Sequence, residues 1–338
     1  MGCVYMNMKK RLCSLLAAAL LLSFCGCADN RKTTRQFFAM DTVMELTAYG
    51  PKAETALDAA EAESYRLDGL LSVGQPGSEI TKLNAGDSDV SGETAELIAA
   101  ALEQARRTEG AFDPTLYPVV EAWGFFSGDY RVPEDAELQA LLTNTSWEAV
   151  QVSGTTVALP EGFAIDLGGI GKGYASLRVK QILQERGVCS ALISLGGNIS
   201  ALGKKPDGSP WIIAVQNPAG EGYLGTLEID NQCVITSGSY QRFFEENGVR
   251  YWHILDPDTG KPARSGMVSV SIVSDDDAAA DALSTALFVM GPERAERFWR
   301  ENADSFEAVW QTEDGGLFVT EGLKDRFHAE GAFEVICR

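Results

Sequence analysis

The run Ala164-Ile165-Asp166-Leu167-Gly168-Gly169-Ile170-Gly171-Lys172-Gly173-Tyr174 leads an apolar, strand-like segment through a glycine-rich turn into a helical pattern. A helix that opens on such a turn can bind phosphate through its backbone N–H groups. The run does not match a P-loop, because Asp166 and Gly173 replace its first Gly and its Ser/Thr, and Tyr174 breaks a dinucleotide fingerprint. It is therefore an anion-binding loop with the cation of Lys172 nearby, or a structural turn.

The chain on both sides of this run alternates irregularly between strand and helix patterns. Strands are expected over 37–49, 149–159, 163–167, 191–195, 211–216, 226–229, 234–237, 252–255, 268–273, 306–311 and 317–320. Helices are expected over 57–71, 93–107, 174–186, 279–290 and 293–301, with a loop over 76–84. Without strict βαβ alternation, this order predicts an α+β fold, a mixed α/β architecture with a β-rich core, flanking helices and two intimate subdomains.

A second polar segment, Ser274–Thr285, contains the helix expected from residue 279. Asp281 and Thr285 are four residues apart, so their oxygens lie on one face of that helix. A carboxylate and a hydroxyl form an incomplete hard-oxygen site, which suits Mg²⁺ that keeps water and substrate phosphates as further ligands. A capping or solvated role explains Asp281 as well, and the acidic residues 275–277 are explained by helix capping.

His253, one of two histidines, lies at an expected strand end that runs into the turn Asp256–Gly260. A histidine beside a phosphate-binding loop can act as a general base, or it can be a structural residue with satisfied hydrogen bonds. If it is the base, the reaction rate should fall as the pH drops below the ordinary histidine pKa of ~6.5.

The N-terminus is a targeting segment. A basic start (Lys9–Arg11) precedes an apolar run (Leu12–Phe24) that is too short to span a bilayer. Gly26 and Cys27 follow, which resembles a bacterial lipobox with Cys27 as the lipidated residue. This predicts a signal peptide over 1–26, a tether over 27–35 and a domain over 36–338, anchored to the extracytoplasmic face of a bacterial membrane. Lipidation at Cys25 and plain secretion are the alternatives.

Composition narrows the classes of function further. The chain has 48 acidic and 28 basic side chains and a formal net charge of −20, which argues against nucleic acid as a partner. Beyond the targeting segment the cysteines Cys189, Cys233 and Cys337 are scattered, so neither a disulfide framework nor a zinc site is expected. We interpret them as buried small apolar residues.

Eight short motifs in fixed order then make the chain recognisable. They are MDT (40–42), SEITKLN (78–84), GAFDPT (110–115), AIDLGGIGKGYA (164–175), SLGGN (194–198), SGSYQRFF (237–244), HILDPDTGKP (253–262) and ADALSTALFVMG (280–291). Together they resemble the ApbE family, the FAD:protein FMN transferases. The resemblance covers nearly all of the chain beyond the tether.

The resemblance implies an Mg²⁺-dependent enzyme that transfers FMN from FAD to a Ser or Thr hydroxyl of a target protein and releases AMP. By motif, the residues that should line the FAD site are Met40, Ala111, Phe112, Asp113, Asp166, Lys172 and Leu255. The Gly169 carbonyl and the side chains of Asp281 and Thr285 should hold the metal, with Ser284 as a further candidate. We assign His253 as the proton acceptor. The chain departs from relatives at Val73-Gly74, where many have an aromatic residue, which puts flavin stacking by that loop in question.

Two other functions remain open at this point. A pyrophosphatase would use the same site with water as the nucleophile and would yield FMN and AMP. A non-catalytic lipoprotein would only bind FAD, although Asp166, Asp281 and Thr285 argue for catalysis. The expected partner for transfer is a membrane redox subunit or another flavin-carrying extracytoplasmic protein.

Overall fold

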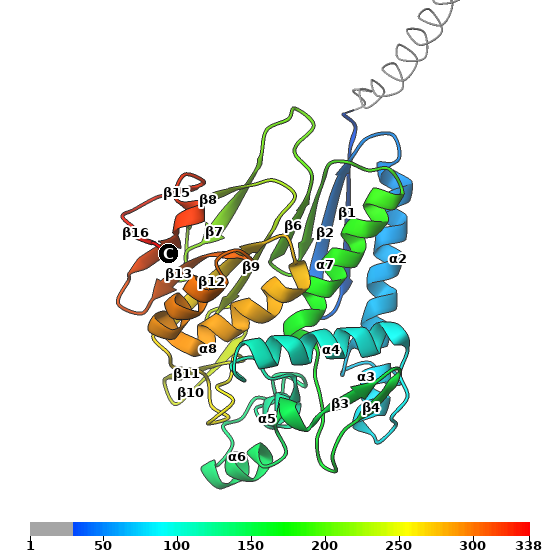
Figure 1. Ribbon diagram of the computed structural model, residues 1–338, viewed down its shortest axis with the longest axis vertical. Coiled ribbons are helices and arrows are strands. Elements are labelled where there is room, and N and C mark those ends of the chain that lie inside the picture. The colour runs from blue at the N-terminus through cyan, green and yellow to red at the C-terminus, as the bar shows by residue number, and fades with distance from the viewer. Residues whose placement is uncertain (1–29) are drawn as a thin grey trace, which may run out of the picture.

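The computed structural model describes residues 30–338, so the expected signal peptide and Cys27 lie outside the described residues. At its centre is a nine-stranded sheet (Figure 1) in which only the β14–β16 pair is parallel. In spatial order its strands are β1 (Lys32–Ala39), β2 (Thr42–Tyr49), β5 (Ala191–Leu195), β6 (Asn198–Leu202), β9 (Cys233–Gly238), β12 (Met267–Ser274), β13 (Glu307–Thr312), β14 (Leu317–Thr320) and β16 (Glu334–Ile336).

The large sheet is covered on both faces over most of its width, and only its β1–β2 end exposes one face. Helices α2 (Ala53–Leu71), α7 (Gly168–Glu185) and α8 (Asp277–Asn302) cover one face, and α4 (Gly92–Arg107) crosses their ends (Figure 1). A small sheet of β7 (Trp211–Gln216), β8 (Tyr223–Ile229) and β15 (Phe327–Ala329) packs on the other. In β12, Ile272 therefore packs in the helix-side core and Val273 in the small-sheet core. The predicted mixed fold with a β-rich core and flanking helices is confirmed.

Shorter elements build a third apolar cluster at one end of the molecule, around the side chains of Val119, Trp123 and Leu138. The remaining elements are α3 (Glu79–Asn84), η1 (Pro114–Leu116), α5 (Tyr117–Ala122), α6 (Asp135–Leu142), η2 (Trp147–Ala149), β3 (Gln151–Ser153), β4 (Thr156–Ala158), β10 (Phe243–Glu246), β11 (Val249–Trp252) and η3 (Glu321–Leu323). The loop expected over 76–84 contains α3, because the Ser78 side chain accepts a hydrogen bond from the Thr81 amide and caps a helix there.

The strand expected over 37–49 is two strands. Met40 and Asp41 have φ of 49° and 57°, so the chain reverses there in a two-residue turn and β1 pairs antiparallel with β2. β1 begins at Lys32, inside the segment 27–35 expected as a tether, because its residues pair along β2 as far as Tyr49. The expected strand over 149–159 is likewise the hairpin β3–β4.

Two expected strands are wrong for a reason that local sequence does not reveal. Residues 163–167 form no strand, because the Asn84 side chain bonds both the N–H and the C=O of Ile165 at 2.8 and 2.9 Å. Over 252–255, only Trp252 belongs to a strand, the end of β11, and the bond from the His253 N–H to the Arg242 carbonyl is the last one in the register of β10 with β11. At Ile165, by contrast, a side chain satisfies the backbone groups in place of a ladder.

The helix predictions are confirmed, with shifts at the ends. The helix predicted from Tyr174 begins at Gly168, so the glycine-rich run is its first turn and a half. The two helices predicted over 279–290 and 293–301 are one helix, α8, with a kink at Gly291, whose φ is 74°. No helix of residues 30–338 is both long enough and apolar enough to cross a membrane.

The interpretation of the cysteines was right only for Cys233, which is buried. Cys189 and Cys337 are exposed. Cys189 lies in the short connection after α7 and Cys337 follows β16 at the C-terminus, so neither stands at an inward-facing position of a regular element. Both thiols are free.

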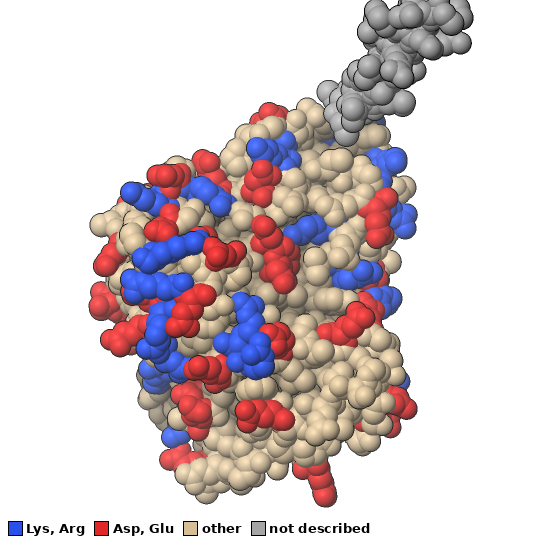
Figure 2. Space-filling view, in the orientation of Figure 1, with Lys and Arg blue, Asp and Glu red and all other residues tan. Residues whose placement is uncertain are grey.

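Surface charges of the helix-covered face are mixed in sign, with Lys and Arg beside Asp and Glu (Figure 2). Many of them form pairs, among them Arg66 with Glu63 at 2.7 Å and Arg106 with Glu103 at 2.6 Å. Exposed pairs of this kind contribute about 0–1 kcal/mol each, because water and salt screen them. They therefore add little to the free energy of unfolding.

One ion pair is different, because both partners are buried. Lys180 on α7 donates from Nζ to Asp277 Oδ2 on α8 at 2.6 Å, and the Asp277 side chain is fully buried. Burial raises the pKa of Asp277, and the Lys180 ammonium opposes that shift. The pair joins the two helices whose contact positions Asp281, one turn further along α8.

Lys180→Met is expected to lower the free energy of unfolding by about 3–5 kcal/mol, because it leaves the Asp277 carboxylate buried without its counter-charge. Urea unfolding measures this loss. Lys204→Met is the matched control, since Lys204 forms an exposed pair with Asp230 and should change stability by at most about 1 kcal/mol. Equal stability of the two variants would contradict the structural role of the buried pair.

Candidate active site

One cavity of about 730 Å³ is lined by all the predicted site residues of the described part of the chain except the further candidate Ser284. Its wall draws on the β1–β2 turn, the loop after α2, the segment before α5, the start of α7, the β5–β6 turn, the loops around β10–β11, and α8. The eleven predicted residues in its lining are Met40, Ala111, Phe112, Asp113, Asp166, Gly169, Lys172, His253, Leu255, Asp281 and Thr285. Ser284 does not line the cavity; its hydroxyl is buried and bonds the Asp281 carbonyl and Ser237.

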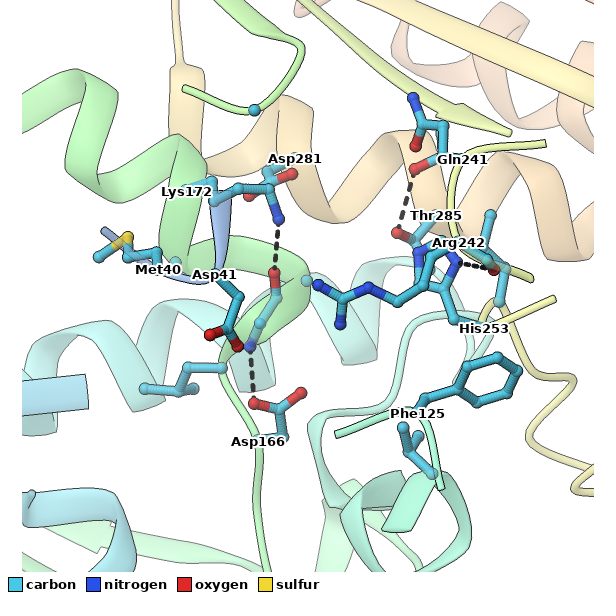
Figure 3. A pocket seen from close by; sticks show the side chains of 18 of the residues that line it. Met40, Asp41, Phe125, Asp166, Lys172, Gln241, Arg242, His253, Asp281 and Thr285 are labelled. Carbon is cyan, nitrogen blue, oxygen red and sulfur yellow. Dashed lines mark hydrogen bonds between the residues drawn. The ribbon is translucent and has the colours of Figure 1, made fainter. Parts of the chain in front are cut away.

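The glycines at the start of α7 allow close approach of neighbouring groups. A Cβ on Gly169 would lie 2.8 Å from the Phe112 ring, and one on Gly168 would lie 2.9 Å from Asp166 Oδ2. The Gly168 N–H donates to Asp166 Oδ1 at 3.0 Å, and Lys172 Nζ donates to the Gly168 carbonyl at 3.4 Å (Figure 3). The glycine-rich run thus brings its backbone, a carboxylate and an ammonium to the cavity wall together.

The surroundings of Asp166 shift the pKa of its carboxyl in opposite directions. Burial raises the pKa of its carboxyl, while the Gly168 N–H, the Lys172 ammonium and the Arg242 guanidinium lower it. Its backbone N–H is held by the Pro114 carbonyl at 2.9 Å, which ties the start of α7 to the segment before α5. The carboxylate is therefore fixed between two walls of the cavity.

Asp113 mainly shapes the cavity wall. Its Oδ1 accepts from the Thr115 N–H at 2.8 Å and the Thr115 hydroxyl at 2.6 Å, and its Oδ2 accepts from the Trp147 N–H at 3.2 Å. Both carboxylate oxygens therefore bond to the chain itself, and they hold the turn that presents Ala111 and Phe112 to the cavity. Burial raises the pKa of Asp113, against the lowering by these hydrogen bonds.

Asp281 is placed where α7 and α8 cross. A Cβ on Gly173 would lie 2.2 Å from the Asp277 carbonyl, so only glycine permits this contact. The Gly173 N–H donates to Asp281 Oδ2 at 2.8 Å, and Asn198 Nδ2 donates to Oδ1 at 3.0 Å. Asp281 is only 6% exposed, and Thr285 stands one turn further along α8 in the same cavity lining.

His253 is held in one tautomer. Its N–H and its Nδ1 lie 3.1 and 3.2 Å from the Arg242 carbonyl, which can only accept, so Nδ1 carries the hydrogen. Nε2 is then the atom with a free lone pair. Burial lowers the pKa of His253 to about 4, and the charges of Arg242 and Lys172 add to that shift. The imidazole is therefore neutral at physiological pH.

Sequence reasoning missed several lining residues. Asn198 and Arg242 belong to motifs that were recognised, but nothing in the motifs shows which side chains face the cavity. Tyr117 and Phe126 also line it, with ring centroids 5.3 Å apart. Burial raises the pKa of Tyr117 to about 12, together with the charges of Glu121 and Asp166, so the phenol stays neutral. The aromatic surface lies on the α5 side of the cavity, whereas Val73-Gly74 supplies none.

Comparisons with known proteins agree over most of the chain. The ApbE family model matches residues 40–310. A relative from Treponema pallidum named FAD:protein FMN transferase is 32% identical and covers 96% of this chain and 96% of its own length. A relative of the same name from Vibrio cholerae is 33% identical, over 89% of this chain and 94% of its own length.

Solved structures agree as well. The crystal structure of the ApbE protein from Thermotoga maritima matches with a TM-score of 0.83 and 33% identity, over 88% of this chain and 99% of that one. The flavin transferase ApbE from Vibrio cholerae matches with a TM-score of 0.79 and 28% identity, over 88% of this chain and 99% of that one. Family model, sequence relatives and fold coincide, and the chain belongs to the ApbE family.

Proposed function

We propose that this protein transfers FMN from FAD to a Ser or Thr hydroxyl of an acceptor protein and releases AMP. The observation that supports this most is the convergence of a neutral imidazole, two cations and a buried carboxylate on one cavity: His253, Lys172, Arg242 and Asp281. The names of the relatives point to the same reaction.

The cavity suits a dinucleotide in size and in the distribution of its surface. Its volume of about 730 Å³ lies within the usual range for small-molecule sites, about 300–1,000 Å³. Lys172 and Arg242 provide positive charge for the pyrophosphate, and the N-terminal end of the α7 dipole adds to it. Tyr117 and Phe126 offer an aromatic surface for a flat ring.

The donor set also fits a magnesium ion. Residues 30–338 contain no cluster of three or more His, Cys, Asp or Glu side chains able to hold a metal. Asp281, the Thr285 hydroxyl and the Gly169 carbonyl are instead an oxygen-only set, and Mg²⁺ commonly binds through one carboxylate with substrate phosphates completing its shell. When bound, Mg²⁺ would neutralise phosphate charge that increases during the reaction.

The residues of the chain then have defined roles in one displacement. The acceptor hydroxyl attacks the FMN-side phosphorus, and its proton passes to His253 Nε2. Nε2 is free to accept it because the ring hydrogen is on Nδ1, which bonds the Arg242 carbonyl. As the new phosphorus–oxygen bond forms, the bond to the bridging oxygen breaks and its electron pair leaves with AMP. Lys172 stabilises the negative charge that results.

Intact-mass analysis tests the function. The protein is incubated with FAD, Mg²⁺ and a candidate acceptor, and the acceptor should gain the mass of one FMN less one water molecule while AMP appears in equal amount. If FMN and AMP appear without acceptor as fast as AMP appears with it, the protein is a pyrophosphatase. FAD that stays intact under both conditions with a range of acceptors would leave only flavin binding.

We also propose that the protein is anchored to the extracytoplasmic face of a bacterial membrane by lipid on Cys27, on the basis of the basic start, apolar run and Gly26-Cys27. Cys27→Ser is expected to move the protein from the membrane fraction to the soluble fraction while its melting temperature stays unchanged. Detergent-free fractionation measures this. Retention of the variant in the membrane fraction would contradict the lipid anchor, because removal of the acyl chains removes the membrane affinity.

A further inference from the structure

Arg242 presents a cation inside the cavity. It lies in the segment between β9 and β10, and its guanidinium extends from the His253 side of the cavity toward the start of α7 (Figure 3). Among residues 30–338 it has no hydrogen bond or ion pair from this group, whereas Arg66 and Arg106 on the surface pair with glutamates. A partly buried cation of this kind gains most from an anion that enters the cavity.

The backbone of the same residue holds the imidazole. The Arg242 carbonyl accepts from the His253 N–H at 3.1 Å and from Nδ1–H at 3.2 Å. The residue that carries the guanidinium therefore also fixes the imidazole, and the charge of Arg242 lowers the pKa of His253 more than the charge of Lys172 does. Lys172 reaches the cavity from α7, where its Nζ bonds the Gly168 carbonyl at 3.4 Å. The two cations thus approach the site from different walls.

This arrangement separates the two phosphates of a bound pyrophosphate. The phosphorus that is attacked must lie beside the base, because the base takes the proton of the attacking hydroxyl. The cation beside the base therefore lies closest to the attacked phosphate, and Lys172 remains for the leaving one. A guanidinium can bond two oxygens of one phosphate at once, which a single ammonium cannot do with the same geometry.

We propose that Arg242 is a catalytic residue whose guanidinium binds the non-bridging oxygens of the FMN-side phosphate and stabilises the charge that grows on them during attack. The inference rests on the proposed function and adds to it the residue that recognises the attacked phosphate. It predicts that Arg242 distinguishes FMN, which contains that phosphate, from AMP, which contains the other one.

Arg242→Gln is expected to reduce kcat for FMN transfer about 10²–10³-fold, as for loss of a group that stabilises transition-state charge. Its Kd for FMN should rise about 10-fold while its Kd for AMP stays the same. Arg242→Lys should recover part of the rate, because it restores charge without the two-pronged geometry. Transfer rates, titrations with FMN and AMP, and thermal melts on each preparation measure these effects.

Arg250→Gln is the matched control, since Arg250 lies on neighbouring β11, outside the cavity lining, and pairs with exposed Glu245 at 2.9 Å. It should leave kcat and both Kd values unchanged. The inference is overturned if Arg242→Gln transfers FMN at the wild-type rate, or if it weakens AMP binding and not FMN binding. If the wild-type protein transfers no FMN, the proposed function fails, and the FMN and AMP titrations still decide whether Arg242 contacts the phosphate.

Discussion

Asp281→Ala is expected to reduce the rate of FMN transfer by about 10³-fold or more, because it removes the only carboxylate from the oxygen set formed with Thr285 and Gly169. FAD binding should weaken less, since Lys172, Arg242 and the aromatic surface of the cavity remain. The measurement is kcat across a Mg²⁺ titration, with the Kd for FAD determined on the same preparation.

The carboxylate of Asp281 also accepts from Gly173 and Asn198, so its loss leaves buried donors without partners at about 1–3 kcal/mol each. Asp281→Asn keeps the volume and removes the charge, and it separates chemistry from folding if the alanine variant melts early. Asp275→Ala is the control, because Asp275 is exposed and lies outside the cavity lining. Normal turnover by folded Asp281→Asn over the whole titration would exclude a role for the Asp281 charge in holding the metal.

How far the sequence predicts this protein depends on where each element finds its partners. Helices α2 and α4 follow from the local spacing of apolar residues, and β5, β7 and β14 have the predicted bounds because alternation and flanking turns define them. The segment 163–167 has an equally apolar pattern, yet the Asn84 side chain, distant in sequence, takes its hydrogen bonds. Local pattern cannot reveal such a partner.

In the candidate site, too, some features follow from the sequence and others depend on residues that are distant in sequence. The eleven residues chosen from the ordered motifs all line one cavity, because motifs record which segments meet in a fold. They did not show that both oxygens of Asp113 are engaged by Thr115 and Trp147, or that the Arg242 side chain enters the cavity. Those properties depend on side-chain orientation, which is set by packing between segments far apart in the chain.

The pKa of His253 is a further property that only the structure supplies. Its ordinary value of ~6.5 would place the acid limit of the reaction near neutrality. Burial, with the charges of Arg242 and Lys172, lowers the pKa to about 4, so the expected limit moves to lower pH. The pKa of the free enzyme governs kcat/KM, which should therefore fall as the pH drops through about 4. The negative pyrophosphate of bound FAD raises the pKa, so kcat should fall at a higher pH than kcat/KM.

The same shift affects stability with a defined sign. Between pH ~6.5 and about 4 the unfolded chain protonates His253 and the folded chain does not, so the free energy of unfolding falls as the pH falls through this window. His253→Ala removes this contribution. The variant should therefore lose less stability than the wild type between pH 6.5 and 4, a difference that urea unfolding at several pH values detects.

His253→Ala is expected to slow FMN transfer by about 10²–10⁴-fold, because the acceptor hydroxyl loses the neutral Nε2 that takes its proton. The Kd for FAD and the melting temperature at pH 8 should stay close to wild-type values, since among residues 30–338 the imidazole forms a hydrogen bond only with the Arg242 carbonyl. His328→Ala is the control, because His328 is exposed on β15, pairs with Glu228 and lies outside the cavity lining, so its loss should leave the rate unchanged. If His253→Ala melts early while its folded fraction transfers FMN at the wild-type rate, His253 is a structural residue and another group accepts the proton.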